Sequence, residues 1–131
     1  MLREPQIVHY VELSSCANNK LVNAYDNTIL YTDYFLNEAI EILKSLTDFD
    51  SKLIYISDHG ESLGEHGLYL HGTPYMIAPS VQINVPFLVW SKSNSKLKRL
   101  TNHSQANVFH SVMGALSMTS LIYKPELDVF K

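Results

Sequence analysis

A short segment near the middle of the chain concentrates side chains suited to binding a metal. Residues 57–72 read SDHGESLGEHGLYLHG and hold three of the six histidines. Asp58 and His59 stand side by side at the start of this segment. A hard carboxylate oxygen combined with a neutral imidazole nitrogen favours zinc over magnesium or calcium. Gly60 lets the backbone turn away from the pair without steric penalty, so the segment is a candidate metal site.

An Asp-His dipeptide alone is more typical of a hydrogen-bonded surface turn than of a metal site. The surroundings favour the metal site, because a long glycine-rich loop with its own aromatic and aliphatic residues is usually functional. Two further carboxylates, Glu61 and Glu65, lie in the same loop. They could act as a general acid/base pair, or as salt-bridge and hydrogen-bond partners that orient His59.

The elements before this loop must position it. Neither glycine nor proline occurs between Gln6 and His59. Apolar residues spaced mostly three or four apart predict a helix from Asn18 or Asn19 to about Leu46, about 40 Å long. The apolar run 53–56 then predicts a strand buried on both faces. The candidate site therefore follows the end of a strand, where ligands bind in α/β sheets.

The elements after the loop complete the predicted fold class. The run 86–90 reads as a second strand, with its proline tolerated at the first position. Apolar residues between 104 and 117 again follow a helical period, with Ser104 as candidate cap, and the tail reads as a turn around Pro125. Helices alternating with strands predict the α/β class, with a mainly parallel sheet flanked by helices.

Composition excludes several classes of protein. With 131 residues, 46% hydrophobic and 18% charged, the chain is typical of one globular domain or part of one. A net charge of −3 and a single small basic cluster at residues 96–99 argue against nucleic-acid binding. The uncharged stretches 67–91 and 100–123 are too polar or too broken by proline to span a membrane, and no signal peptide is visible. We therefore expect the chain as given to be soluble.

The chain has a single cysteine, Cys16, which cannot form an internal disulfide. It is either a buried or unpaired thiol, or half of a disulfide whose partner lies on sequence absent here.

Several runs of the sequence resemble one family, the phosphoethanolamine transferases that modify lipid A, which include the mobile colistin-resistance enzymes. The resemblance rests on residues 57–65 and 69–75, and on the run 24–36, which is similar to a long helix of that family. Residues 85–87 and 107–110 also look familial. The resemblance covers roughly residues 16–130, whereas residues 1–15 form an atypical start.

The resemblance implies that residues 1–131 are the carboxy-terminal part of a periplasmic catalytic domain. Its fold would be an α/β/α sandwich of the alkaline phosphatase/sulfatase type, attached to an amino-terminal domain in the inner membrane. The implied enzyme moves phosphoethanolamine from phosphatidylethanolamine to a lipid A phosphate through a phosphorylated threonine, a reaction tied to polymyxin resistance. Cys16 then looks like half of a periplasmic disulfide.

The resemblance also implies roles for individual residues. In the family pattern a glutamate, the nucleophilic threonine and an adjacent Asp-His pair hold zinc, and Asp58 and His59 match that pair. His71 matches a histidine near the substrate phosphate. His66 stands where the family commonly has asparagine, and it joins Glu61 as a weaker candidate. The threonine and the glutamate belong to family sequence upstream of this chain, so we expect weak zinc binding and no transfer by this chain alone.

Two other functions remain open at the level of sequence. One is a sulfatase- or phosphodiesterase-type hydrolase sharing the fold, although the run 67–72 favours the transferase. The other is a non-catalytic remnant that kept the fold and lost the chemistry. The acceptor, lipid A or a core sugar, and the oligomeric state are not encoded in any pattern of residues.

Overall fold

The computed structural model describes residues 13–93, 97–98 and 103–130. Residues 1–12 of the atypical start, and residues 96 and 99 of the basic cluster, lie outside these residues. The chain divides into two compact units. One comprises Met1–Thr32 and His59–Asn84, and the other Asp33–Asp58 and Val85–Lys131.

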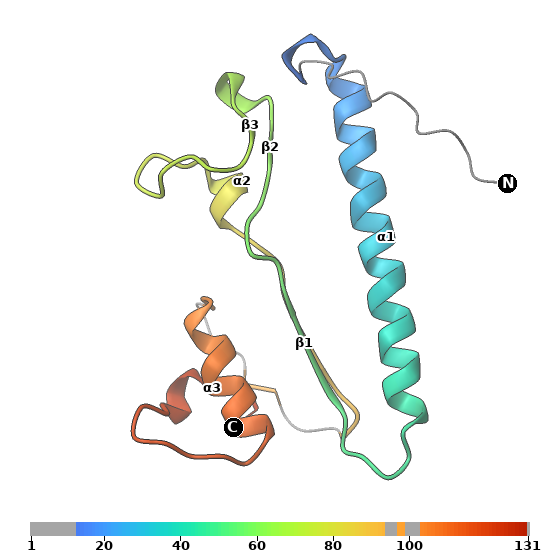
Figure 1. Ribbon diagram of the computed structural model, residues 1–131, viewed down its shortest axis with the longest axis vertical. Coiled ribbons are helices and arrows are strands. Elements are labelled where there is room, and N and C mark those ends of the chain that lie inside the picture. Colours follow the sequence, from blue (N-terminus) through green and yellow to red (C-terminus); the bar gives the residue numbers. More distant parts are fainter. Residues whose placement is uncertain (1–12, 94–96, 99–102, 131) are drawn as a thin grey trace, which may run out of the picture. The chain divides into compact units, whose positions relative to one another are not determined.

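The predicted long helix is present as α1, Asn18–Ser45, after a short 3-10 turn, η1, at Leu13–Ser15. Figure 1 shows α1 as one continuous helix. Near its C-terminus Lys44 lies 2.7 Å from Glu41, and a cation in the last turn interacts favourably with the helix dipole. None of the α1 residues is fully buried.

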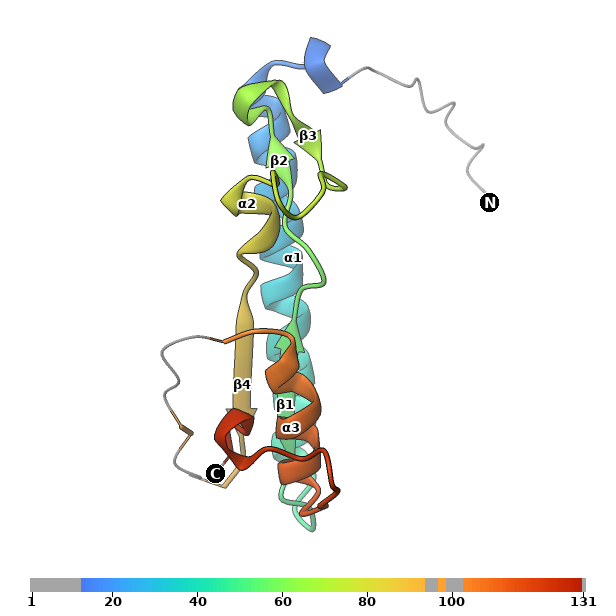
Figure 2. The same ribbon diagram turned by 90° about the vertical axis from the view of Figure 1, so that its left-hand side faces the viewer.

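The two predicted strands are also present, but they run in opposite directions. Strand β1, Lys52–Ile56, pairs antiparallel with β4, Phe87–Ser91, in the register Lys52↔Ser91 to Ile56↔Phe87 (Figures 1 and 2). The predicted mainly parallel sheet is thus not shown among the described residues. The reason is physical, since an apolar run indicates burial of a strand but carries no information on the direction of its neighbour.

Polar contacts join the two strands at one end of this pair. The Asp50 carboxylate lies 2.6 Å from Lys52 Nζ, and its other oxygen accepts a hydrogen bond from the Ser93 backbone N–H at 3.3 Å. The Lys52 ammonium and Ser93 together hold the pKa of the Asp50 carboxyl below its ordinary value. The start of β1 is therefore tied to the residues just after β4.

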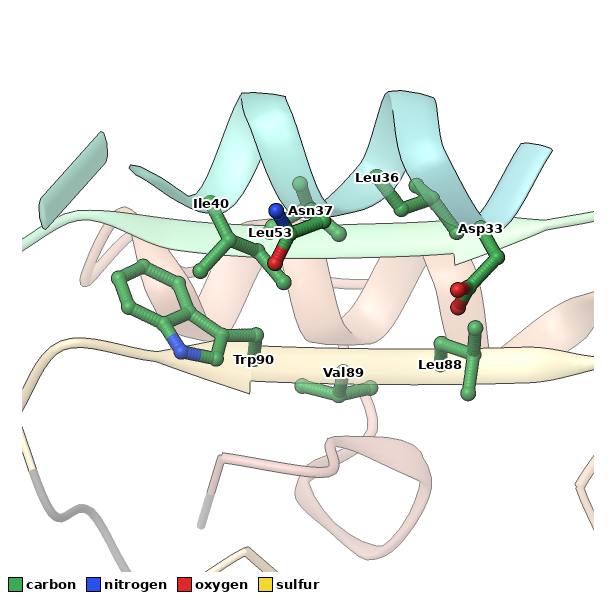
Figure 3. Close-up of a pocket in the computed structure, with 8 residues that line it drawn as sticks. All are labelled: Asp33, Leu36, Asn37, Ile40, Leu53, Leu88, Val89 and Trp90. Carbon is green, nitrogen blue, oxygen red and sulfur yellow. The ribbon is translucent and has the colours of Figure 1, made fainter. Parts of the chain in front are cut away.

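Helix α1 and the strand pair enclose a cavity of about 360 Å³ within the second unit (Figure 3). Its walls are mostly apolar. Four lining residues come from α1 and four from the strands: Asp33, Leu36, Asn37, Ile40, Leu53, Leu88, Val89 and Trp90.

The predicted irregular segment contains more local structure than its glycines indicate. Strands β2, Ser62–Leu63, and β3, Tyr69–Leu70, form a small antiparallel hairpin. A 3-10 turn, η2, at Glu65–Gly67 closes this hairpin, and a single helical turn, α2, follows at Ser80–Ile83.

The last helix packs on the tail through polar groups. Helix α3, Ala106–Ala115, and the 3-10 turn η3, Pro125–Leu127, are joined by a hydrogen bond from Asn107 Nδ2 to the Leu127 carbonyl at 2.8 Å. The Val129 N–H donates to Ser111 Oγ at 3.1 Å. Val129 is the only fully buried hydrophobic residue in the described part of the chain. The apolar residues that predicted this helix are largely exposed, including Phe109, Val112 and Leu116.

Two further predictions concern single features. Cys16 is a half-buried free thiol in this chain. Over the residues that the structure describes, no helix has both the length and the apolar character needed to cross a membrane.

Candidate metal centre

Three side chains of the predicted site lie together. One nitrogen each from His59 and His71 and one carboxylate oxygen of Glu61 lie within 4.8 Å of one another. All three residues belong to the first compact unit. Two of them, His59 and His71, were predicted to bind metal and substrate, and Glu61 was the weaker candidate.

The β2–β3 hairpin explains why residues ten apart in sequence meet. Ser62 pairs with Leu70, so Glu61 and His71 flank that pair at the open end of the hairpin. Leu70 adopts φ 62° and Gly72 φ 103°. The left-handed region is costly for a residue with a side chain, by roughly 1–3 kcal/mol, and such strain clusters at functional sites. The backbone thus turns sharply on both sides of His71.

The contacts within the group are unequal. His71 Nδ1 lies 2.8 Å from Glu61 Oε1, within hydrogen-bond distance, whereas His59 Nδ1 lies 3.7 Å from the same oxygen. The two imidazole rings stack with centroids 3.6 Å apart and an interplanar angle of 27°. His59 Nδ1 also lies 3.1 Å from the Gly60 carbonyl oxygen. Glu61 is therefore the closer partner of His71, whereas the sequence indicated that it would orient His59.

The backbone beneath Glu61 is held on both sides by the α2 turn. The Gly60 N–H donates to the Gln82 carbonyl at 2.9 Å, and Gln82 Nε2 donates to Ser62 Oγ at 2.8 Å. A Cβ atom at position 60 would lie 1.9 Å from the Val81 carbonyl oxygen, so only glycine allows this close approach. Gln82 and Ser62 are both buried.

The donor set fits a divalent metal ion. Zinc binds imidazole nitrogen and carboxylate oxygen at about 2.0–2.2 Å, so its ligand atoms lie up to about 4 Å apart. The ligand atoms lie within 4.8 Å of one another, and small rotations of these exposed or half-buried side chains would bring them to such distances. Glu61 Oε2 is buried without a hydrogen-bond partner among the described residues. A buried, unpaired carboxylate oxygen is costly, and a cation or a hydrogen-bond donor would satisfy it.

The remaining predicted residues do not join this group. Asp58 is exposed, belongs to the second unit, and its backbone carbonyl accepts a hydrogen bond from Gln105 Nε2 at 3.2 Å. His66 is exposed in η2 at φ 54°. Glu65 accepts the Leu63 N–H at 2.7 Å and so supports the hairpin turn. The Glu61–His71 pair could not be found by motif spacing, because it depends on the hairpin register.

Comparison with known proteins assigns this chain to a family. A sequence model of the family described as Sulfatase matches residues 6–118. Phosphoethanolamine transferase EptA of Salmonella typhimurium is 40% identical over 133 residues, covering 92% of this chain and 24% of that protein. Phosphatidylethanolamine transferase Mcr-1 of Escherichia coli is 47% identical over 81 residues, covering 61% of this chain and 15% of that protein.

Solved structures agree with the sequence comparison. The periplasmic domain of phosphoethanolamine transferase EptC from Campylobacter jejuni superposes with a TM-score of 0.84 at 45% identity, covering 92% of this chain and 41% of that structure. The soluble domain of lipooligosaccharide phosphoethanolamine transferase A from Neisseria meningitidis gives a TM-score of 0.84 at 36% identity, covering 91% and 40%. The chain spans about a quarter of the length of the EptA relatives it matches, at 24%.

Proposed function

Because the chain belongs to the sulfatase family, we propose that it is a carboxy-terminal segment of the catalytic domain of a zinc-dependent phosphoethanolamine transferase. The complete enzyme would move phosphoethanolamine from phosphatidylethanolamine to a lipid A phosphate. The observation that carries this proposal is the convergence of His59, Glu61 and His71 in a loop whose relatives are named as such transferases.

The proposed roles of the individual residues follow from their chemistry. His59 would hold the metal together with Asp58, and Glu61 and His71 would lie beside it. A zinc ion, when bound, supplies positive charge that stabilises a phosphoryl group during transfer. Phosphoryl transfer depends mostly on positioning and electrostatic stabilisation. The stacked histidines and the anchored Glu61 provide a preformed arrangement of donors for this purpose.

The longer protein is part of the proposal. Sequence outside this chain would complete the α/β/α sandwich with its mainly parallel sheet. It would also supply the nucleophilic threonine, the glutamate ligand and the inner-membrane anchor. Accordingly we expect weak zinc binding and no turnover by these 131 residues alone. Two solved structures from Neisseria meningitidis support this arrangement: the soluble domain of lipooligosaccharide phosphoethanolamine transferase A and the integral membrane form of the same transferase.

A hydrolase of the same family is the second candidate. The description of the family model, Sulfatase, is consistent with hydrolysis. The curated relatives, however, are named as transferases, at 32–47% identity. The two reactions differ in the acceptor, which is water in one and a lipid phosphate in the other.

A chimera tests the proposed function directly. Residues 16–130 would replace the matching carboxy-terminal part of Salmonella EptA, which shares 40% identity with this chain. We expect the chimera to add phosphoethanolamine to lipid A in cells, as measured by mass spectrometry of extracted lipid. We expect the same chimera with His59→Ala to lose the modification.

The control is the chimera carrying His66→Asn, at a position that lies apart from the three-donor group. It should retain the modification. A well-expressed chimera that leaves lipid A unmodified, or that releases free phosphoethanolamine instead, would contradict the transferase proposal.

A further inference from the structure

Glu61 is the most firmly held member of the candidate site. Its neighbours Gly60 and Ser62 are both tied to Gln82, through a backbone bond of 2.9 Å and a side-chain bond of 2.8 Å. Its side chain is 22% exposed, against 50% for that of His71. Glu61 therefore presents a carboxylate on an anchored backbone, and the more exposed imidazole of His71 lies against it.

The contact between the two side chains selects one atom of the imidazole. His71 Nδ1 lies 2.8 Å from Glu61 Oε1, and a carboxylate oxygen can only accept a hydrogen bond. The contact is therefore a hydrogen bond when Nδ1 carries the proton. The neutral ring then has its lone pair on Nε2, on the side of the ring away from Glu61. In metal sites such a carboxylate partner fixes the tautomer and the orientation of a histidine.

The backbone around His71 supports the same interpretation. Leu70, with φ 62°, is held in the left-handed region without being glycine, and its side chain is largely exposed. Burial of Leu70 therefore does not compensate for this strain, which costs about 1–3 kcal/mol. The turn does bring the His71 ring onto Glu61 and against the His59 ring.

We propose that Glu61 is a positioning residue for His71: it holds the imidazole in the Nδ1–H tautomer and so leaves Nε2 as the atom that meets the metal or the transferred phosphoryl group. This inference rests on the proposed function and deepens it. It replaces the expectation that Glu61 orients His59, whose ring lies 3.7 Å from the same oxygen. Glu61 itself acts through His71 and need not touch the substrate.

The test reads the tautomer of His71 by long-range ¹H–¹⁵N NMR on the metal-free full chain labelled at histidine. His71→Gln assigns the signals. The spectra are recorded at a pH of about 8, above the ordinary histidine pKa of about 6.5. We expect the Nδ1–H form in the unsubstituted chain and in Glu61→Gln, whose amide oxygen can still accept the bond. In Glu61→Ala we expect a shift toward the Nε2–H form that predominates in free histidine.

Glu65→Ala is the matched control, because Glu65 is a carboxylate of the same loop that contacts the Leu63 N–H instead of a histidine. It should leave the tautomer unchanged. Unchanged backbone signals for residues 60–72 in Glu61→Ala exclude simple unfolding of the hairpin. If that variant unfolds, the tautomer of His71 in the unsubstituted chain still tests the inference. A His71 ring in the Nε2–H form, or a tautomer indifferent to Glu61→Ala, would overturn the inference.

The result is separable from the transferase assignment. If the tautomer depends on Glu61 but the EptA chimera does not modify lipid A, the positioning role stands and the proposed reaction fails. If the chimera modifies lipid A but the tautomer of His71 does not depend on Glu61, the proposed reaction stands and the positioning role is wrong.

Discussion

The three side chains of the candidate centre differ in how firmly each is fixed. Glu61 is anchored through its neighbours to Gln82, and His71 is held by Glu61. His59 has its ring stacked on that of His71 and its Nδ1 3.1 Å from the Gly60 carbonyl oxygen. Such a graded arrangement suits a metal site, in which a ligand must rotate slightly to reach bonding distance while its support stays in place.

At this scale the expectation concerns zinc affinity. His59→Ala removes a direct donor, and since loss of an outer partner alone costs about 10–100-fold in metal affinity, we expect a loss of at least about tenfold. Calorimetric titration of the full chain with zinc measures it. His66→Ala, an exposed histidine of the same loop outside the three-donor group, is the matched control and should change affinity less than about twofold. Equal losses in the two variants would show that zinc binds adventitiously to exposed imidazoles.

At the scale of elements, two parts of the fold depend on glycine. Gly60 allows the loop to approach Val81, and Gly114 allows α3 to approach Asp128 of the tail. Asp128 is fully buried, accepts the Tyr123 hydroxyl at 2.6 Å and accepts the Phe130 N–H at 2.8 Å. These bonds hold the Asp128 carboxylate against α3, where it leaves no space for a methyl group at position 114.

Gly114→Ala tests this packing. The added Cβ would lie 1.7 Å from Asp128 Oδ2, so the carboxylate must move and lose its bonds. We expect a loss of about 1–3 kcal/mol in the free energy of unfolding, measured by urea denaturation, despite the better helix propensity of alanine. In an Asp128→Ala background the colliding atoms are gone, and Gly114→Ala should become neutral or stabilising. A loss of the same size in both backgrounds would mean that the collision is not the cause.

The elements were more predictable than their pairing. Apolar spacing predicted α1 and both strands of the β1–β4 pair to within a residue or two, because each pattern reports local burial. The antiparallel direction of β4 and the β2–β3 hairpin depend on contacts distant in sequence. For the same reason the sequence indicated His59 and His71 as site residues, whereas the partner of Glu61 could be identified only once Ser62 was paired with Leu70. Asp58 stays a predicted ligand that the three-donor group does not include.

At the scale of the whole chain, apolar surface is the dominant feature. Hydrophobic residues make up 46% of the sequence, yet Val129 is the only one fully buried in the described part. Tyr31, Phe35 and Ile42 lie along one side of α1 and are 61–69% exposed. Because the chain covers 41% of the solved Campylobacter periplasmic domain, a longer protein of this family contains further structure able to cover such a face.

Substitutions at two adjacent residues of α1 distinguish side-chain packing within this chain from packing against the rest of a longer protein. Leu36 lines the cavity against the strands, whereas Phe35 is 61% exposed. In the chain alone we expect Leu36→Ala to lower the free energy of unfolding by about 1–2 kcal/mol, since the side chain is half-buried. Phe35→Ala in the same chain should change the free energy of unfolding by less than about 0.5 kcal/mol. In the EptA chimera, where the rest of the domain is present, Phe35→Ala should lower the free energy of unfolding by more than about 2 kcal/mol. Urea denaturation of the soluble domain of the chimera measures this change. A Phe35→Ala cost that is the same in both proteins would show that this face of α1 stays exposed, and that the family domain packs on the segment elsewhere.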